Sequence, residues 1–347
     1  MPRSFLAFTL ATLFPLPFLV AGALFGGWAV WIALFYITLF VAGVDEFIPA
    51  LTRDGEPAET EEADLLSLIL VGAHFLLLFL MVWSLSGRGT GLLSFDGLAL
   101  FAATGLFMGQ VSNSNAHELI HRSARPLRRA GKWVYISLLF GHHTSAHPLV
   151  HHTHVGTPND PNTSRMNESF YRFVRRAWLG SFKAGLKAEE KRLAQIGADR
   201  WDIRHPYLLY IGGAGIVLLV SFIIAGWRGV IVHVLLAAFA QTQLMLSDYV
   251  QHYGLERAQR DDGSFEPVDA RHSWNAPHWL SSLWMLNAPR HSDHHAHPSK
   301  HYTALEIPAR GEAPMLPHAL PVMACIALWP KLWRKVMNPH AEAWRSA

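Results

Sequence analysis

The sequence predicts an all-α, polytopic membrane protein with about six transmembrane helices and a histidine-rich, helical metal site. Hydrophobic residues make up 51% of the 347 residues and charged residues only 16%, and the mean hydropathy is +0.17. The apolar residues gather in stretches that approach the ~20 residues a membrane-spanning helix needs. The chain also has 21 histidines, most of them in polar segments directly after an apolar stretch. This composition is not that of an ordinary soluble enzyme.

Six apolar stretches are long enough to span a bilayer, and we expect them to belong to one domain over residues 1–347. They are residues 5–23, 26–44, 65–85, 92–112, 207–225 and 229–247. The first two are separated only by Gly26 and Gly27, which predicts a tight helical hairpin. A seventh stretch, 314–329, is short and interrupted by prolines, so we expect it to be interfacial or re-entrant.

Lysine and arginine placement predicts the orientation in the membrane. Fifteen of these residues lie in segment 113–206 and ten follow residue 248, whereas the short loops 86–91 and 226–228 hold one each. Because basic loops stay on the cytoplasmic side, segments 113–206 and 248–347 and both termini are expected to be cytoplasmic. The segment 45–64 belongs on the same side but includes the acidic run 55–64. The predicted location is the inner (plasma) membrane.

Histidines cluster at helical spacing in three of the polar segments. NAHELIHR places two histidines at i, i+4, and HPLVHH places two more at that spacing with a third adjacent; residues so spaced share a helical face. RHSDHHAHP repeats the pattern at i, i+3 and i+4, and SDYVQHYGLER adds one histidine. The candidate ligands are His117, His121, His147, His151, His152, His252, His291, His294 and His295.

These residue types indicate a centre with two metal ions. Neutral imidazole binds divalent iron, copper, nickel and zinc. Nine imidazoles exceed the four to six ligands of a single ion, so the count predicts two ions. Spacing alone does not choose every ligand, because His143 and His154 lie on the same helical line as His147 and His151.

Other functions use parts of the same pattern. HELIH matches the HExxH motif of zinc proteases, with Glu118 as general base, but that reading leaves the other clusters unexplained. Glu118 and His121 form one Glu-x-x-His, whereas soluble di-iron carboxylate bundles need two. A metal transporter would favour ionisable residues within the spans; His74 and His233 are the candidates, and packing explains them more simply.

Composition excludes further classes of function. A formal charge of +3 is too small to indicate a nucleic-acid partner, so none is expected. Cys325 is the single cysteine, which excludes an internal disulfide, a cysteine-based zinc site and a fused iron–sulfur module, since such a module needs four cysteines.

The motifs resemble the integral-membrane alkane hydroxylases, the non-haem di-iron alkane 1-monooxygenase family within the membrane fatty acid desaturase and hydroxylase superfamily. The resemblance runs from HELIHR through HPLVHHTHVGTPNDP and QHYGLER to NAPRHSDHHAHP, and includes the tail WPKLWRKVMNP. QHYGLER and RHSDHHAHP are its specific pieces. It implies that the nine histidines above are the ligands, with His143 and His154 as the runners-up. The chain departs from the usual motifs at Ala146, Val150, Gln251 and Arg122.

The resemblance also implies the activity. Two iron ions would activate O2 and hydroxylate the terminal methyl group of an alkane, of medium chain length, that enters from the membrane lipid, giving a primary alcohol. Rubredoxin and rubredoxin reductase would supply the electrons, and Arg172, Arg175 and Arg176 are candidates to attract that acidic carrier. Asp160, Asp248 and Asp293 are candidates to hold ligating imidazoles. The nearest rivals are a fatty acyl desaturase or hydroxylase and a xylene-type side-chain monooxygenase.

Overall fold

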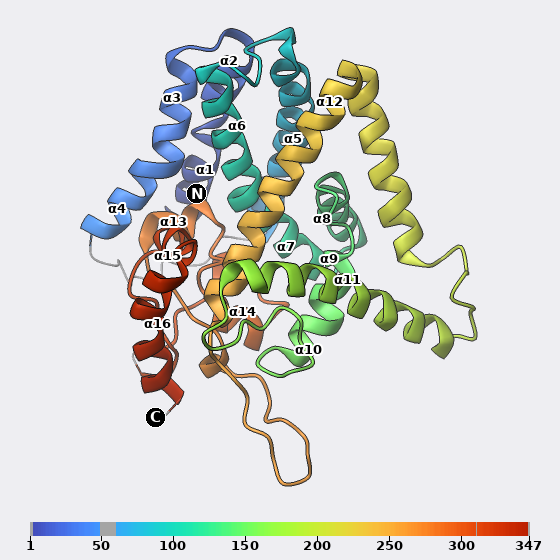
Figure 1. The fold of residues 1–347 in the computed structure, drawn as a ribbon, viewed down its shortest axis with the longest axis vertical. Coiled ribbons are helices and arrows are strands. Elements are labelled where there is room, and N and C mark those ends of the chain that lie inside the picture. Colours follow the sequence, from blue (N-terminus) through green and yellow to red (C-terminus); the bar gives the residue numbers. More distant parts are fainter. Residues whose placement is uncertain (1–2, 49–59, 310, 346–347) are drawn as a thin grey trace.

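The computed structural model describes residues 3–48, 60–309 and 311–345, and these residues form helices joined by loops (Figure 1). None of the described residues belongs to a β-strand, since the pairings between extended segments are isolated bridges. The predicted all-α class is therefore confirmed. Most of segment 45–64 lies outside the described residues.

The N-terminal part of the chain folds into mostly apolar helical elements in the upper half of Figure 1. They are α1 (Arg3–Leu13), α2 (Leu16–Phe25), α3 (Trp28–Phe35), η1 (Tyr36–Phe40), α4 (Val41–Phe47), α5 (Thr60–Trp83), η2 (Ser84–Arg88) and α6 (Phe95–Phe107). Gly26 and Gly27, both with positive φ, reverse the chain between α2 and α3, as the predicted hairpin requires.

Helix α12 (Pro206–His252) contains the fifth and sixth predicted spans. Forty-seven residues in one straight helix would be about 70 Å long, far more than a bilayer needs. The helix instead reverses at Ala225 and Gly226, whose φ and ψ are not helical. Its two arms form a hairpin (Figure 1), joined by a hydrogen bond between Ser221 and His233.

Five helical segments are long and apolar enough to cross a membrane, and α12 with its two arms is one of them. They are Phe5–Phe25, Trp28–Phe47, Thr60–Arg88, Phe95–His121 and Pro206–His252. These segments overlap all six predicted spans, although the second and fourth begin at Trp28 and Phe95, two and three residues later than predicted. The seventh apolar stretch holds only the eight-residue helix α15 (Leu320–Ala327), which at about 12 Å is too short to cross a bilayer.

Most of the remaining elements lie in the lower half of Figure 1. They are η3 (Met108–Ser112), α7 (Asn113–His121), α8 (Arg125–Ser137), α9 (His143–Ala146), η4 (His147–His151), α10 (His152–His154), α11 (Phe170–Gln195), η5 (Ala270–His272), α13 (Trp279–Trp284), α14 (His291–Ala296), η6 (Tyr302–Ala304) and α16 (Pro330–Arg345). Every histidine cluster lies in this half or at its border.

Two glycines let α6 and η3 approach the second arm of α12 closely. Gly105 and Gly109 form a G-x-x-x-G motif, which in membrane helices marks a close helix–helix contact. A Cβ on Gly105 would lie 2.1 Å from a ring carbon of Phe239, and a Cβ on Gly109 would lie 2.4 Å from Cγ of Gln243. This contact fixes the end of α6, and hence α7, against the end of α12 that carries His252.

Candidate metal centre

The nine candidate ligands come together from four separate stretches of the chain and form two groups. Within each group the potential ligand atoms lie within 4.8 Å of one another. The first histidine group comprises His117, His121, His147, His152 and His294. The second histidine group comprises His151, His252, His291 and His295. The groups are adjacent, since the rings of His152 and His295 have centroids 4.5 Å apart.

A π-helical turn decides which histidine joins which group. The i, i+4 spacing predicts a shared face for His147 and His151, and their rings are neighbours with centroids 5.1 Å apart, but they belong to different groups. Residues 147–151 form the π-turn η4, in which the backbone N–H of His152 donates to the carbonyl of His147. Because a π-turn closes on residue i+5, His152 lies beside His147, with their Nε2 atoms 2.9 Å apart. His151 therefore faces the second group.

Helix α14 also divides its histidines between the groups. His291 and His295 are one turn apart and belong to the second group, while His294 belongs to the first. His291 approaches His252, at the end of α12, with 3.0 Å between the Nε2 atoms. His294 approaches His152 with an Nε2 separation of 3.2 Å. The short helix thus lies between α12 and η4 and completes both groups.

The spacing of the ring nitrogens fits shared metal ions. Adjacent ligands at right angles, with nitrogen–metal bonds of about 2.1 Å, lie about 3.0 Å apart. In the first group the Nε2 atom of His147 lies 2.7 Å from that of His117. In the second group the Nε2 atoms of His291 and His295 are 3.1 Å apart. Among the described residues, Nε2 of His121 and of His151 are buried without a hydrogen-bond partner. Metal ligation would satisfy these atoms.

Burial keeps the imidazoles in the neutral form that binds metal. It lowers the pKa of several of them well below the usual range, and the neighbouring histidines lower it further, because a second positive charge nearby is unfavourable. The affected residues outside the apolar helices are His147, His152, His291, His294 and His295.

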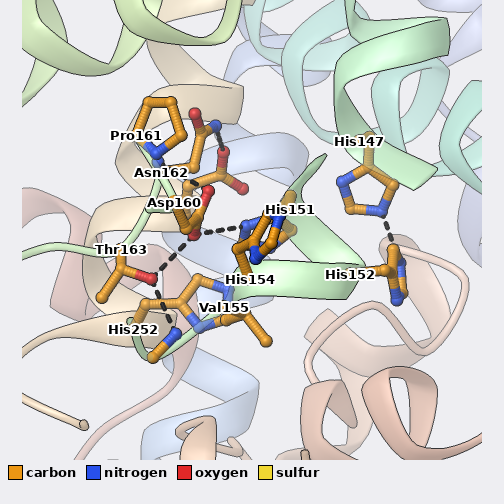
Figure 2. A network of polar contacts seen from close by, with 12 residues as sticks. His147, His151, His152, His154, Val155, Asp160, Pro161, Asn162, Thr163 and His252 are labelled. Carbon is orange, nitrogen blue, oxygen red and sulfur yellow. Dashed lines mark hydrogen bonds and ion pairs between the residues drawn. The ribbon is translucent and has the colours of Figure 1, made fainter. Parts of the chain in front are cut away.

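Asp160 holds one of the imidazoles in place (Figure 2). Its Oδ2 lies 2.8 Å from Nδ1 of His151 and also accepts a hydrogen bond from the hydroxyl of Thr163. Burial disfavours a charged imidazole, yet this carboxylate raises the pKa of His151 above its ordinary value. Burial also opposes ionisation of Asp160, but His151 and the other donors lower its pKa. This interaction leaves Nε2 of His151 directed at the second group.

The other two aspartates make different contacts. Asp248 is buried and accepts a hydrogen bond from Nδ2 of Asn162, two residues after Asp160. The carboxylate of Asp293 accepts hydrogen bonds from Lys300 and from the backbone of Glu306, and it pairs with His297. Asp293 thus fastens the loop after α14 instead of holding a ligand.

His143 and His154, which helical spacing could not separate from the chosen ligands, lie outside both histidine groups. His143 stacks on His147, with ring centroids 4.9 Å apart, and also on Phe140. His154 is partly exposed in α10.

Glu118, the base of the HExxH alternative, accepts hydrogen bonds from Arg122 and from the backbone of Tyr302. A protease mechanism would need this carboxylate at the metal, so the arrangement does not support it.

A cavity of about 660 Å³, including its open mouth, reaches both histidine groups. It lies between η3, the end of α12 and α15, and it touches His117 of the first group and His291 of the second. Most of its exposed lining is apolar. It was not predicted from the sequence, because its walls come from segments more than 100 residues apart.

Polar side chains in this cavity direct their hydrogen bonds to the protein. Asn113 donates to the carbonyls of Gly109 and Ala240. Gln251 donates to the carbonyl of Ala288. Gln110 accepts a 2.6 Å hydrogen bond from the indole N–H of the fully buried Trp284. Amide groups that already bond to the protein do not demand a polar ligand.

Comparison with known proteins identifies the family. The fatty acid desaturase family model matches residues 94–327. Alkane 1-monooxygenase of Ectopseudomonas oleovorans is 33% identical over 280 residues, which cover 80% of this chain and 68% of that protein. Alkane 1-monooxygenase 1 of Alcanivorax borkumensis is 31% identical over 326 residues, which cover 92% and 80%. The hydroxylase component of the Pseudomonas putida xylene/toluene monooxygenase is 28% identical over 248 residues, which cover 66% and 60%. The chain therefore belongs to the alkane 1-monooxygenase family, within the fatty acid desaturases.

Proposed function

We propose that this protein hydroxylates the terminal carbon of medium-chain alkanes to primary alcohols, using O2 and a pair of iron ions. The observation that carries the proposal is the gathering of nine histidines into two adjacent groups beside one mostly apolar cavity. The nine histidines would hold the two ions, which when bound supply the activation of O2 with two external electrons. Relatives named alkane 1-monooxygenase support the choice of substrate.

The protein's own residues would position the hydrocarbon. The cavity admits a chain between η3 and α12, with one end beside His117 and His291. Its lining offers mostly apolar contact, and the amides of Asn113 and Gln251 already donate hydrogen bonds to the protein. Trp284, behind Gln110, would limit the length of chain that fits, which favours medium-chain alkanes.

We infer that the protein crosses the inner membrane several times, with the metal site and both termini on the cytoplasmic side. The distribution of lysine and arginine supports this orientation. Electrons would come from rubredoxin, reduced by rubredoxin reductase, because the chain has one cysteine and no iron–sulfur site of its own. Arg172 and Arg175 are exposed on α11, whereas Arg176 is paired with Glu168 inside the protein.

Metal analysis of the detergent-purified protein tests the centre. We expect about two irons per chain, reduced in His294→Ala and retained in His154→Ala, because only His294 lies in a histidine group. Product analysis with a rubredoxin system then tests the reaction. Octane should give 1-octanol; an alkene from an acyl chain, or a benzylic alcohol from xylene without alkane turnover, would contradict the proposed substrate. A single zinc unaffected by His294→Ala would contradict the iron pair.

A further inference from the structure

A second large groove lies on the opposite side of η4 from the histidines. It measures about 780 Å³ including its mouth, and its walls are α8, α9, η4, α11 and the start of α12. We call it the basic groove, because Arg128, Lys132 and Arg192 line it together with the carboxylate of Glu189. Pro148 and Leu149, the middle residues of η4, form another part of its wall.

The groove carries more positive than negative charge. Arg192 pairs with Glu189, with 3.0 Å between Nη1 and Oε2, so these two charges cancel. Arg128 donates to the backbone carbonyls of Arg122 and Ser123, which orients its guanidinium without neutralising it. Burial lowers the pKa of Lys132; Glu189 opposes this, and Arg129 and Arg128 add to it. An anion in the groove would relieve this excess of positive charge.

The basic groove opens at the level where apolar helices end. The candidate span Phe95–His121 ends beside it at Ile120, and the candidate span of α12 begins beside it at Pro206. The first turns of α12 expose Leu208 (51%), Leu209 (42%) and Ile211 (63%). Positive charge next to an exposed apolar strip suits a ligand with an anionic head and hydrocarbon chains.

We propose that the basic groove binds the phosphate headgroup of an anionic phospholipid, whose acyl chains lie along the first arm of α12. Basic pockets at the cytoplasmic ends of membrane helices are suited to such headgroups. The bound lipid would contact the outer side of η4, which carries two of the candidate metal ligands, His147 and His151. This inference depends on the membrane location but not on alkane turnover.

Two pairs of substitutions on α8 separate a site from a general charge effect. Arg128→Gln with Lys132→Gln removes two positive charges from the groove. Arg125→Gln with Arg129→Gln removes two charges from the exposed side of the same helix. The readouts are the phospholipids that co-purify in detergent, and the shift in melting temperature on adding phosphatidylglycerol or phosphatidylcholine with identical acyl chains.

We expect phosphatidylglycerol to stabilise the wild type and the Arg125/Arg129 variant more than phosphatidylcholine does. The Arg128/Lys132 variant should bind phosphatidylglycerol about tenfold or more weakly than the wild type does. Phosphatidylglycerol should then stabilise this variant no more than phosphatidylcholine does. Lys132→Gln alone gives a smaller loss in the same direction if the double variant folds poorly. An equal loss of phosphatidylglycerol binding in the two double variants would overturn the proposal. The same stabilisation by glycerol phosphate alone would overturn the lipid as ligand.

Discussion

Asp160 gives the clearest prediction at the scale of single residues, because it bonds directly to the ring of His151. Asp160→Asn keeps the size of the side chain but removes the charge that makes this imidazole more basic. We expect metal affinity to fall by about 10–100-fold, the usual effect of losing such a partner. Metal titration of the apoprotein measures this.

Asp293→Asn is the matched comparison, since it lies between two ligands in sequence but pairs with Lys300 and His297. We expect it to retain both metals and to reduce thermal stability through the loop after α14. Equal loss of metal in the two variants would mean that the hydrogen bond from His151 to Asp160 has no special part in the centre.

Individual residues also show what sequence spacing could predict. All nine histidines chosen from the motifs fall into the two groups, while His143 and His154 do not. Asp160 could be proposed as a partner of an imidazole because it follows the cluster in the sequence. The sequence could not exclude Asp293 as a partner of an imidazole. Its contact with Lys300 depends on the folding of the loop after α14.

At the scale of helices, the contact of α6 with α12 depends on glycine. A Cβ at Gly105 would overlap the ring of Phe239. We expect Gly105→Ala to destabilise the protein by about 1–3 kcal/mol, as overpacking does. Gly72→Ala, in α5, is the control, because nothing lies within 4 Å of a Cβ there. Since alanine favours helix over glycine, that variant should be unchanged or slightly more stable. Thermal unfolding in detergent compares the two.

Helix α13 separates the cavity from an apolar groove whose walls include α1, α3 and η1. Leu283 lines that groove, Met285 lines the cavity, and the buried Trp284 lies between them. Trp284→Ala would extend the cavity toward Tyr36, whose ring lies 5.9 Å from the indole. We expect turnover to shift toward longer alkanes, with a stability cost of about 3–5 kcal/mol.

Trp279→Ala controls for the loss of a tryptophan from the same helix, because Trp279 is 40% exposed on the groove side. Its chain-length profile should match the wild type. A profile that is also unchanged in Trp284→Ala would mean that another wall ends the cavity. Gas chromatography of the alcohols formed from an alkane mixture gives both profiles in one experiment.

The π-turn marks the limit of sequence prediction at this scale. Hydropathy located the spans because each needs a continuous apolar stretch, and α12 contains two of them as expected. The assignment of His151 and His152 to different groups depends on one widened turn. No composition rule signals a π-turn, so α-helical spacing did not predict that the neighbouring residues His147 and His151 belong to different groups.

At the scale of the whole molecule, the two histidine groups connect regions distant in the sequence. Without metal, the close-set buried imidazoles depend on one another for hydrogen bonds. We expect that removing the metal with a strong chelator lowers the melting temperature by on the order of 10 °C, because the metal binds tightly to the folded state and not to the unfolded state. Reloading with zinc should restore stability without activity. An unchanged melting temperature would show that the helices hold the groups together unaided.

The shared use of η4 and α14 has a consequence for assembly of the centre. With His152, which directly follows η4, the two elements supply ligands to both groups: His147, His152 and His294 to the first, His151, His291 and His295 to the second. An ion bound in one histidine group therefore orders the segments that also supply ligands to the other group. The first ion incurs the entropic cost of ordering these segments, so the second ion does not. Loading should be cooperative, with chains that hold either both ions or none, and few that hold one. Native mass spectrometry of half-loaded protein would reveal that distribution directly.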